Sequence, residues 1–126
     1  MIFGIGTDIL AVRRMADMHA RHGDRLARRL LASEELGDYE RAPSKARFLA
    51  KRFAAKEALG KAMGTGIRAP LTLTAVGVVH DALGRPDFSC SPELAAWLKA
   101  RGAGAVHLSL SDERDTVVAF VIVERP

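Results

Sequence analysis

An acidic and a basic side chain share one face of a helical pattern near the middle of the chain. Glu57 and Lys61 lie four residues apart and stack with Phe53 at about 100° per residue. A carboxylate one turn before an ammonium is usually an ordinary surface ion pair worth about 0.2–0.5 kcal/mol. A chemical role for Glu57 and Lys61 is favoured by Asp8, which ends a distant apolar segment. It is also favoured by a strongly basic helix that lies between Asp8 and this pair in the sequence.

The pair lies in a segment, from Ser44 to Met63, that is predicted to form a long helix. It is rich in Ala, Leu, Lys, Arg and Glu, which are strong helix formers. Ser44 can cap its start, and Gly64 can end it in a left-handed conformation. The glycine turn 64–66 that follows either presents backbone N–H groups to a phosphate or simply caps the helix.

The segment before Asp8 is predicted to be a buried strand from Ile2 to Ile9. Gly4 and Gly6 allow another backbone to approach it closely. A dinucleotide-binding loop is rejected, because the third glycine and the strand–helix unit of that motif are missing. Asp8 itself could equally be a turn or helix-cap residue, which is the commoner role of such an aspartate.

A basic helix is predicted between residues 13 and 32, with a break at Gly23–Asp24 as an alternative. Four arginines share one face if the helix runs on: Arg14, Arg21, Arg25 and Arg28. An apolar stripe lies beside them, made of Met15, Met18, His22 and Leu26. A row of charged residues is usually just the solvated face of a helix, and methionines at helical spacing are usually core residues. Since only two acids fall in the segment, however, this face suits an acidic amphipathic helix.

The remaining patterns predict an α+β domain. A helix is expected from residue 33, a hairpin from strands 71–80 and 85–90, and a helix from Ser91-Pro92-Glu93 to Gly102. Strand 106–111 alternates, so His107, Ser109 and Ser111 share one face. Strand 116–123 is almost continuously apolar, which predicts burial on both faces, centrally or at a subunit contact. The order is strand, helices, hairpin, helix, hairpin, and residues 1–126 form a single domain.

Composition limits the class of protein and of partner. The formal net charge is +4 and the pI about 9.7, which indicates an acidic partner: nucleic acid, anionic lipid, a phosphate-rich ligand or an acidic protein. A single cysteine, Cys90, excludes an internal disulfide and fits a reducing cytoplasm. No signal peptide or membrane-spanning segment is recognisable, so no membrane association is expected.

Three separated motifs resemble those of the holo-acyl-carrier-protein synthases, the small bacterial-type 4′-phosphopantetheinyl transferases. Gly4-Ile5-Gly6-Thr7-Asp8-Ile9 resembles the first signature. Arg52-Phe53-Ala54-Ala55-Lys56-Glu57-Ala58 with Lys61 and Gly64-Thr65-Gly66 resembles the second and most specific one. His107-Leu108-Ser109-Leu110-Ser111 resembles the third, and Gly84-Arg85-Pro86 a glycine–basic–proline turn. The resemblance runs nearly from end to end and implies the 4′-phosphopantetheinyl transferase fold.

The resemblance implies an enzyme that moves 4′-phosphopantetheine from coenzyme A to a serine of apo acyl carrier protein, for fatty acid synthesis. Asp8 and Glu57 match the ligands of Mg²⁺, and Lys61 matches the lysine that holds a diphosphate oxygen. The general base is either Glu57, acting through water, or Glu35. The residues implied to bind coenzyme A are Lys61, Gly64, Thr65, Gly66, Arg52, Pro86, His107 and Ser109.

The resemblance also implies two protein partners. Acyl carrier protein is acidic, and the implied docking residues are Arg14, Met18, Arg21, Arg25 and Arg28. The second partner is the chain itself, in a homotrimer with active sites between subunits. Asp112 stands where many relatives have a second histidine, which leaves the role of that loop open.

Several alternatives stay open from sequence alone. A basic nucleic-acid-binding module would explain the charge, but aromatic residues are only 6% of the chain and no groove-reading motif is present. The acceptor could instead be a carrier domain of polyketide or peptide synthesis, although the transferases of the larger subclass are about twice this length. A non-catalytic subunit-contact domain would leave Asp8, Glu57 and Lys61 as ordinary surface charges.

Overall fold

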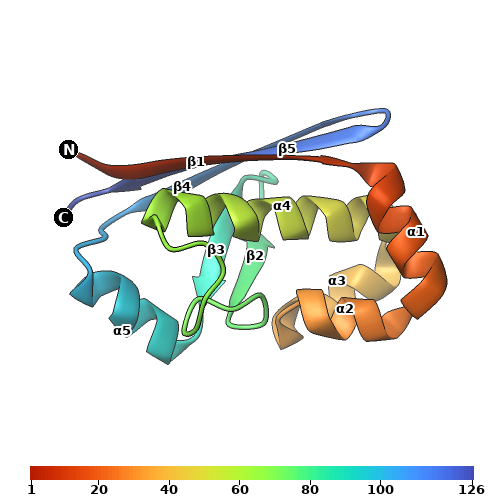
Figure 1. The fold of residues 1–126 in the computed structure, drawn as a ribbon, viewed down its shortest axis with the longest axis horizontal. Coiled ribbons are helices and arrows are strands. Elements are labelled where there is room, and N and C mark those ends of the chain that lie inside the picture. The colour runs from red at the N-terminus through yellow and green to blue at the C-terminus, as the bar shows by residue number, and fades with distance from the viewer.

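A long central helix, α4 (Lys45–Met63), is covered on one side by an antiparallel sheet in the computed structural model, which describes all 126 residues. The strand order of this sheet is β1 (Ile2–Ala11), β5 (Thr116–Glu124), β4 (Val106–Glu113). Figure 1 shows β1 and β5 running above α4 along most of its length. The last strand is therefore central, as one of the two sequence alternatives predicted.

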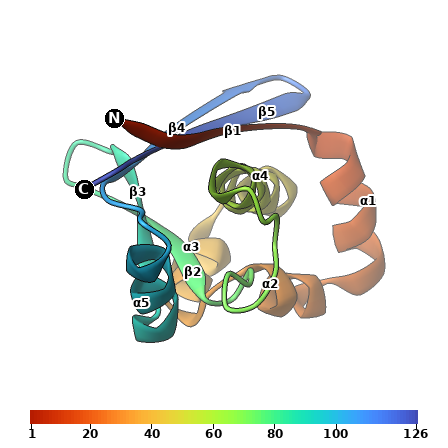
Figure 2. The same ribbon diagram turned by 60° about the vertical axis from the view of Figure 1, so that its left-hand side comes forward.

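The other elements form a second layer on the side of α4 that faces away from the sheet. In chain order these are α1 (Val12–His22), α2 (Asp24–Leu30), the 3₁₀ turn η1 (Ser33–Glu35), α3 (Leu36–Arg41), the hairpin β2 (Val76–His80) and β3 (Pro86–Cys90), and α5 (Pro92–Ala100). Figure 2 shows α4 nearly end-on, between the sheet and this second layer. The observed order confirms the predicted α+β arrangement.

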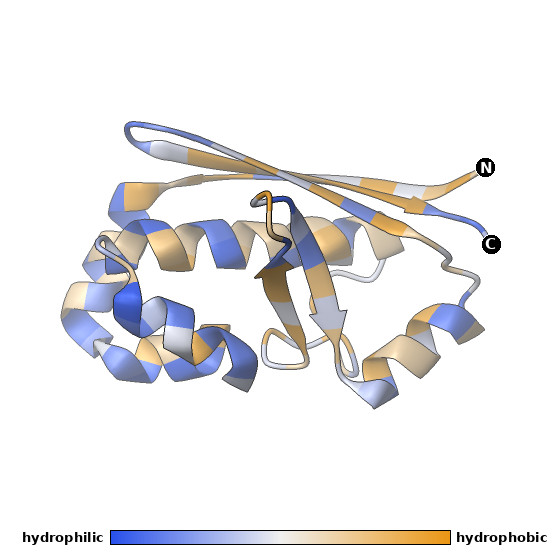
Figure 3. Cartoon of the chain, turned by 180° about the vertical axis from the view of Figure 1, so that it is seen from behind, coloured by the Kyte–Doolittle hydropathy of each residue, from blue (hydrophilic) through white to orange (hydrophobic).

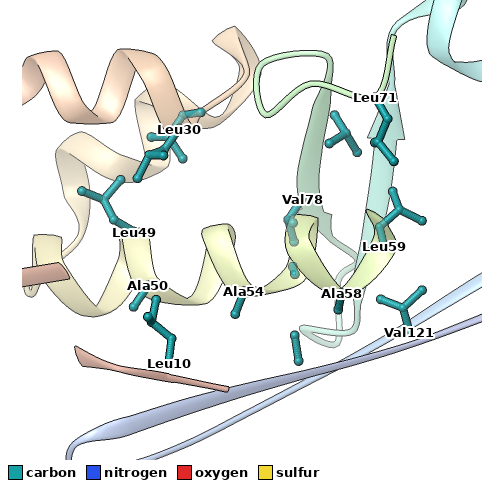
Figure 4. Packing of buried hydrophobic residues seen from close by; sticks show 14 of the residues in the cluster. Leu10, Leu30, Leu49, Ala50, Ala54, Ala58, Leu59, Leu71, Val78 and Val121 are labelled. Carbon is teal, nitrogen blue, oxygen red and sulfur yellow. The ribbon is translucent and has the colours of Figure 1, made fainter. Parts of the chain in front are cut away.

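Burial on both sides explains the alanine-rich sequence of α4. Ala50, Ala54 and Ala58 lie toward the sheet, while Leu49 and Leu59 point toward the second layer (Figure 4). All five side chains are completely buried. Small residues on the sheet side let the strand and helix backbones come close, and the larger leucines fill the space on the other side. None of the helices combines the length and the apolar composition that a membrane span requires.

Two glycines of β1 permit this close packing. A Cβ atom at Gly6 would lie 1.9 Å from the carbonyl oxygen of Ala58, and one at Gly4 would lie 1.9 Å from that of Ala62. No side chain can occupy either position without moving β1 away from α4. The predicted close backbone approach is therefore confirmed, and it brings β1 against the helix that carries Glu57 and Lys61.

The predicted ends of the central helix are also confirmed. The Ser44 hydroxyl accepts a hydrogen bond from the Arg47 N–H at 3.3 Å, and Gly64 ends α4 with a φ of 78°. The basic segment breaks at Gly23, whose φ is 56°, so it forms two helices rather than one. In the hairpin, the first strand begins at Val76 rather than at the predicted Leu71. Leu71 belongs to the loop before this strand, and its completely buried side chain packs that loop onto the core.

The sheet differs from the prediction in having one open face. Residues of β5 alternate, so Val117, Ala119, Val121 and Val123 are buried against α4. On the other face Phe120 is 39% exposed, and the neighbouring β1 residues Ile5 and Ile9 are 59% and 67% exposed. The prediction that strand 116–123 is buried on both faces is wrong for this single chain, because helices cover only one side of the sheet. Figure 3 shows the apolar residues along these strands.

Candidate active site

An ion pair joins β1 to α4 at the predicted site. The Lys61 ammonium lies 3.1 Å from a carboxylate oxygen of Asp8 and donates to the carbonyl of Thr7 at 2.9 Å. Lys61 forms no ion pair with Glu57, although the two residues are one helical turn apart. The surface-pair interpretation of Glu57 and Lys61 is therefore wrong, and the lysine instead contacts the distant strand.

Glu57 completes a cluster of three charges. Burial raises the pKa of its carboxyl above the usual value, the negative charge of Asp8 raises it further, and Lys61 opposes the shift. Two carboxylates thus share one site with a single ammonium. Repulsion between like charges favours a cation at such a site.

The cluster fits the ligand requirements of Mg²⁺ rather than those of a metal held entirely by protein. The chain has no group of three or more His, Cys, Asp or Glu side chains arranged around a common point. Mg²⁺ is commonly held by one or two carboxylates, with waters and substrate phosphate oxygens in the other positions. Asp8 and Glu57 supply that number of carboxylates, and the half-exposed Lys61 leaves the site open to a phosphorylated ligand.

Glu35 is not accessible to a substrate. Its side chain is completely buried and accepts hydrogen bonds from the backbone N–H groups of Ala32 at 2.8 Å and Val78 at 3.0 Å. It also accepts from Arg52 at 2.9 Å and from Lys56 at 2.5 Å. A carboxylate with four donors and no exposed surface cannot collect a proton from a bound hydroxyl. The suggestion that Glu35 is the general base is therefore wrong.

Arg52 belongs to the same buried group. Its guanidinium donates to Glu35 and to the carbonyl of Val78 at 2.6 Å, and its side chain is only 6% exposed. The prediction that Arg52 contacts coenzyme A is not supported, since its donors are directed into the protein. Lys56 is also fully buried, and burial lowers the pKa of its ammonium while the charge of Glu35 acts in the opposite direction.

The glycine turn after α4 caps the helix. The N–H of Gly64 donates to the backbone carbonyl of Lys61, and the N–H groups of Thr65 and Gly66 donate to the carbonyl of Gly60, at 3.0–3.2 Å. Gly60 permits this turn, because a Cβ atom there would lie 2.8 Å from the carbonyl carbon of Gly66. The three backbone N–H groups of the turn are therefore hydrogen-bonded to carbonyls of the same chain. Of the two sequence alternatives, the helix cap is observed and the phosphate-binding amides are not.

A hollow of about 340 Å³ lies between the β2–β3 hairpin and β4. It brings together two predicted coenzyme A contacts, Pro86 and His107, with His80 and Arg85. Ser109 faces the same side of β4 but does not line the hollow. His107 contacts Glu124 at 2.7 Å, and this contact lowers the pKa of Glu124.

Sequence reasoning missed His80 as a member of this hollow. Burial lowers the pKa of His80, as do the nearby charges of Arg52 and Lys51. The only available signal was its position at the end of a predicted strand beside the Gly84-Arg85-Pro86 turn. Pairing of His80 with Pro86 across the hairpin places it there.

Asp112 anchors the β4–β5 hairpin to the start of α4. Its carboxylate lies 2.9 Å from Arg47 and 3.2 Å from Lys51. A hydrogen bond from Lys51, the charge of Lys51 and the contacts of Arg47 lower the pKa of Asp112. Arg47 also donates to the backbone carbonyls of Glu113 and Arg114. Asp112, whose loop was left without an assigned role by the sequence, thus forms ion pairs within the chain.

The predicted docking residues are all exposed, but they lie on two helices. Arg14, Met18 and Arg21 belong to α1, whereas Arg25 and Arg28 belong to α2. The break at Gly23 therefore replaces the predicted single row with a basic corner. A hollow of about 160 Å³ at this corner is lined by Met18, His22, Arg25, Leu26 and Arg29. Met15 and Leu26, two members of the predicted stripe, are core residues.

The family of the chain follows from its similarity to known proteins. Residues 4–121 match the family model of the 4′-phosphopantetheinyl transferase superfamily. The chain is 57% identical over 124 residues to the holo-[acyl-carrier-protein] synthase of Laribacter hongkongensis, covering 98% of this chain and 99% of that protein. It is 55% identical to that of Dechloromonas aromatica, covering 98% of each chain. The chain belongs to this superfamily of transferases.

Solved structures agree with this family. The crystal structure of holo-[acyl-carrier-protein] synthase from Neisseria meningitidis has a TM-score of 0.96 and 48% identity, covering 99% of this chain and 100% of that one. A synthase from Bacillus anthracis in complex with CoA (3′,5′-ADP) has a TM-score of 0.84 and 33% identity, covering 100% and 99%. Within the superfamily, the chain is a holo-[acyl-carrier-protein] synthase, the kind of transferase that moves phosphopantetheine from coenzyme A to apo acyl carrier protein.

Proposed function

We propose that the chain carries out this transfer at a Mg²⁺ site held by Asp8 and Glu57, with Lys61 on the diphosphate of coenzyme A. The observation that carries the proposal is the convergence of these three charges from β1 and α4. In the reaction, a serine oxygen of the carrier forms a bond to the phosphorus of the phosphopantetheine arm. The bond from that phosphorus to the bridging diphosphate oxygen breaks, and adenosine 3′,5′-bisphosphate leaves.

The three residues supply charge stabilisation and alignment. Mg²⁺, when bound by the two carboxylates, would supply Lewis-acid polarisation of the diphosphate. Lys61 stabilises the negative charge that accumulates on the leaving bisphosphate, and its contact with Thr7 fixes the direction of its ammonium. With Glu35 buried, Glu57 acting through a water is the remaining candidate to accept the serine proton.

The hollow beside β4 is the proposed site for the nucleotide end of coenzyme A. Its volume of about 340 Å³ is in the range of small-molecule sites. Arg85 supplies a positive charge for phosphate, and His80 and His107 supply ring nitrogens for hydrogen bonds. A relative's structure with CoA (3′,5′-ADP) supports binding of this ligand class by the fold.

The basic corner of α1 and α2 is the proposed docking surface for acyl carrier protein. The exposed arginines provide charge complementarity to an acidic helix. The small hollow beside them, which includes Met18 and Leu26, provides an apolar depression at the same corner. Fatty acid synthesis is the proposed use of the product, and the cytoplasm, suggested by the unpaired Cys90, is the proposed location.

A homotrimer is proposed on the open face of the sheet. Ile5, Ile9 and Phe120 are exposed apolar side chains on that face, and a second chain would remove them from water. Sedimentation equilibrium should give three times the mass of the chain. Replacement of Ile9 by Asp should lower that mass to one chain, whereas a parent protein that is monomeric at micromolar concentration contradicts the proposal.

The transfer itself can be tested by mass spectrometry of the carrier. Purified chain is incubated with apo acyl carrier protein, coenzyme A and Mg²⁺, and the carrier should gain the mass of one phosphopantetheine arm. A carrier whose acceptor serine is replaced by alanine serves as the control and should gain nothing. Carrier domains of polyketide and peptide synthesis, tested in parallel, report the range of acceptors. Unchanged mass of every acceptor would overturn the proposal.

A further inference from the structure

A buried lysine beside the proposed metal ligand has no part in the mechanism described so far. Lys56 has no exposed surface. Its ammonium donates to the carbonyls of Leu30 at 2.8 Å and Leu73 at 2.8 Å, and to Glu35 at 2.5 Å. Three elements are therefore tied to α4 through one side chain: α2, the turn η1 and the loop before β2.

Glu35 extends these ties to the hairpin. It accepts from the backbone N–H groups of Ala32 and Val78, and Arg52 joins it to the carbonyl of Val78. Arg52 and Lys56 are four residues apart, so they leave α4 on the same face, one turn after the other. No buried side-chain nitrogen or oxygen in the chain lacks a hydrogen-bond partner. The group is thus a complete polar network on one side of α4.

This network faces away from the sheet. At 100° per residue, Lys56 points about 200° away from Ala58, the residue whose carbonyl meets Gly6. Glu57 lies between these two directions. The backbone contact holds one side of α4 and the polar network holds the other, so together they fix the rotation of the helix about its axis. That rotation sets where Glu57 and Lys61 stand relative to Asp8.

We propose that Lys56 is a positioning residue for the transfer site, which holds α4 in the rotation that brings Glu57 and Lys61 to Asp8. The inference rests on the proposed function for what that site does. Loss of stability alone does not show this role, because removing one partner of a buried ion pair leaves the other charge uncompensated and is itself destabilising. A positioning role is distinguished by its effect on Mg²⁺ affinity, at a site whose side chains the Lys56 ammonium does not contact.

The test compares Lys56→Met with Lys99→Met, which removes the same charge from an exposed site on α5. Lys56→Met should raise the Kd for Mg²⁺, measured by titration calorimetry, and lower kcat, each by about 10–100-fold, as with other residues that orient a metal ligand. KM for the carrier should change less than kcat, because Lys56 bonds only the last residue of α2, Leu30, and the docking arginines lie on the exposed faces of α1 and α2. Lys99→Met should match the parent in all three.

A measurement without metal follows the network directly. Hydrogen exchange of the Ala32 and Val78 amides, which donate to Glu35, should be faster in Lys56→Met than in the parent. Lys56→Gln, which keeps an NH₂ donor group but not the charge, should give smaller changes of the same sign. A Lys56→Met protein with parental kcat and Mg²⁺ affinity overturns the inference. If neither Lys56→Met nor Lys56→Gln folds, the positioning role is also overturned, because Lys56 would then be required for folding. A parent that transfers nothing refutes the proposed function instead, while the exchange measurement still tests the network.

Discussion

The ammonium of Lys61 lies 3.1 Å from the carboxylate of Asp8, although 53 positions separate them in the chain. Close packing of β1 on α4 creates this contact, because Gly6 has no side chain to hold the two backbones apart. The proposed transfer site therefore depends on a packing contact between two elements as much as on the charged residues that they carry.

Replacement of Lys61 distinguishes a role in the transfer reaction from a role in folding stability. Lys61→Ala should cost about 1 kcal/mol of folding stability or less, because the ion pair is partly exposed. The same change should lower kcat by about 10²-fold, the usual effect of removing one charge-stabilising donor. Lys61→Arg should be impaired less, because charge is kept while the planar fork fits the place of an ammonium poorly.

Melting curves and steady-state kinetics on the two Lys61 variants check this prediction. Lys99→Ala, an exposed lysine on α5, is the matched control and should leave both measurements unchanged. Normal turnover in Lys61→Ala would return this residue to ordinary surface chemistry.

Gly6 should be intolerant of even one methyl group. Gly6→Ala places a Cβ atom 1.9 Å from the carbonyl oxygen of Ala58, and β1 must move to relieve the clash. Overpacking of this kind costs about 1–3 kcal/mol or more, and the movement also separates Asp8 from Lys61. Chemical denaturation and transfer assays should show both losses.

The control is Gly37→Ala in α3, where the nearest atoms to an added Cβ are those of the Arg41 side chain, at 3.6 Å. Alanine is the better helix former, so this change should stabilise the chain by about 0.5–1 kcal/mol. Equal stability of the two variants would contradict the close approach of β1 and α4.

The raised pKa of Glu57 makes stability depend on pH and on metal. Because the native carboxyl holds its proton more tightly than the unfolded one, metal-free stability should fall as pH rises from 4.5, the ordinary pKa of a glutamate carboxyl, through the raised pKa of Glu57. Glu57→Gln removes this contribution. It should raise the Tm of the metal-free protein near pH 7.

Mg²⁺ should have the opposite effect on the parent, because it binds the ionised carboxyls. Its addition should raise the Tm near pH 7 and have progressively less effect as Glu57 is protonated at lower pH. Thermal melts with and without Mg²⁺, recorded between pH 4.5 and pH 7, test both the pH dependence of the metal-free protein and the stabilisation by Mg²⁺. A Mg²⁺ shift that is retained in Glu57→Gln would place the ion elsewhere.

Arg14 tests the docking surface. Arg14→Glu reverses an exposed charge on α1 and should raise KM for acyl carrier protein by roughly tenfold, the equivalent of about 1.4 kcal/mol. KM for coenzyme A should stay unchanged. Raised salt should weaken carrier binding by the parent in the same way, because exposed charges are screened beyond about 8 Å at physiological ionic strength.

The control for Arg14 is Lys99→Glu, which makes the same change of net charge on α5. An equal rise in KM for the carrier in both variants would show that total charge, rather than the basic corner, controls docking. A rise in KM for coenzyme A instead would move α1 into the nucleotide site.

Local chemistry made most of the fold predictable. Ser44 and Gly64 mark the ends of α4 through hydrogen bonds made by the cap residues themselves, and these need no information from elsewhere in the chain. The open face of the sheet was not predictable in the same way. An apolar strand such as β5 has the same pattern whether its second face packs on a helix or awaits another chain.

The candidate site was predictable in its charges but not in its contacts. Motif resemblance selected Asp8, Glu57 and Lys61, yet helical spacing alone paired Lys61 with the wrong carboxylate. Glu35 and Arg52 are charged residues of the kind that is usually exposed, and only the tertiary structure shows that they bind each other in the interior. Spacing along one element carries no information about which element packs against it.

The most direct test of the Mg²⁺ site is the rate of carrier modification as a function of Mg²⁺ concentration, in the parent and in Asp8→Asn and Glu57→Gln. No holo carrier should form in EDTA, and Mg²⁺ should restore its formation by the parent. Either variant should lose most turnover while it stays folded. Transfer at the parental rate by either variant, or by the parent in EDTA, would contradict the assignment of Asp8 and Glu57 as the metal site.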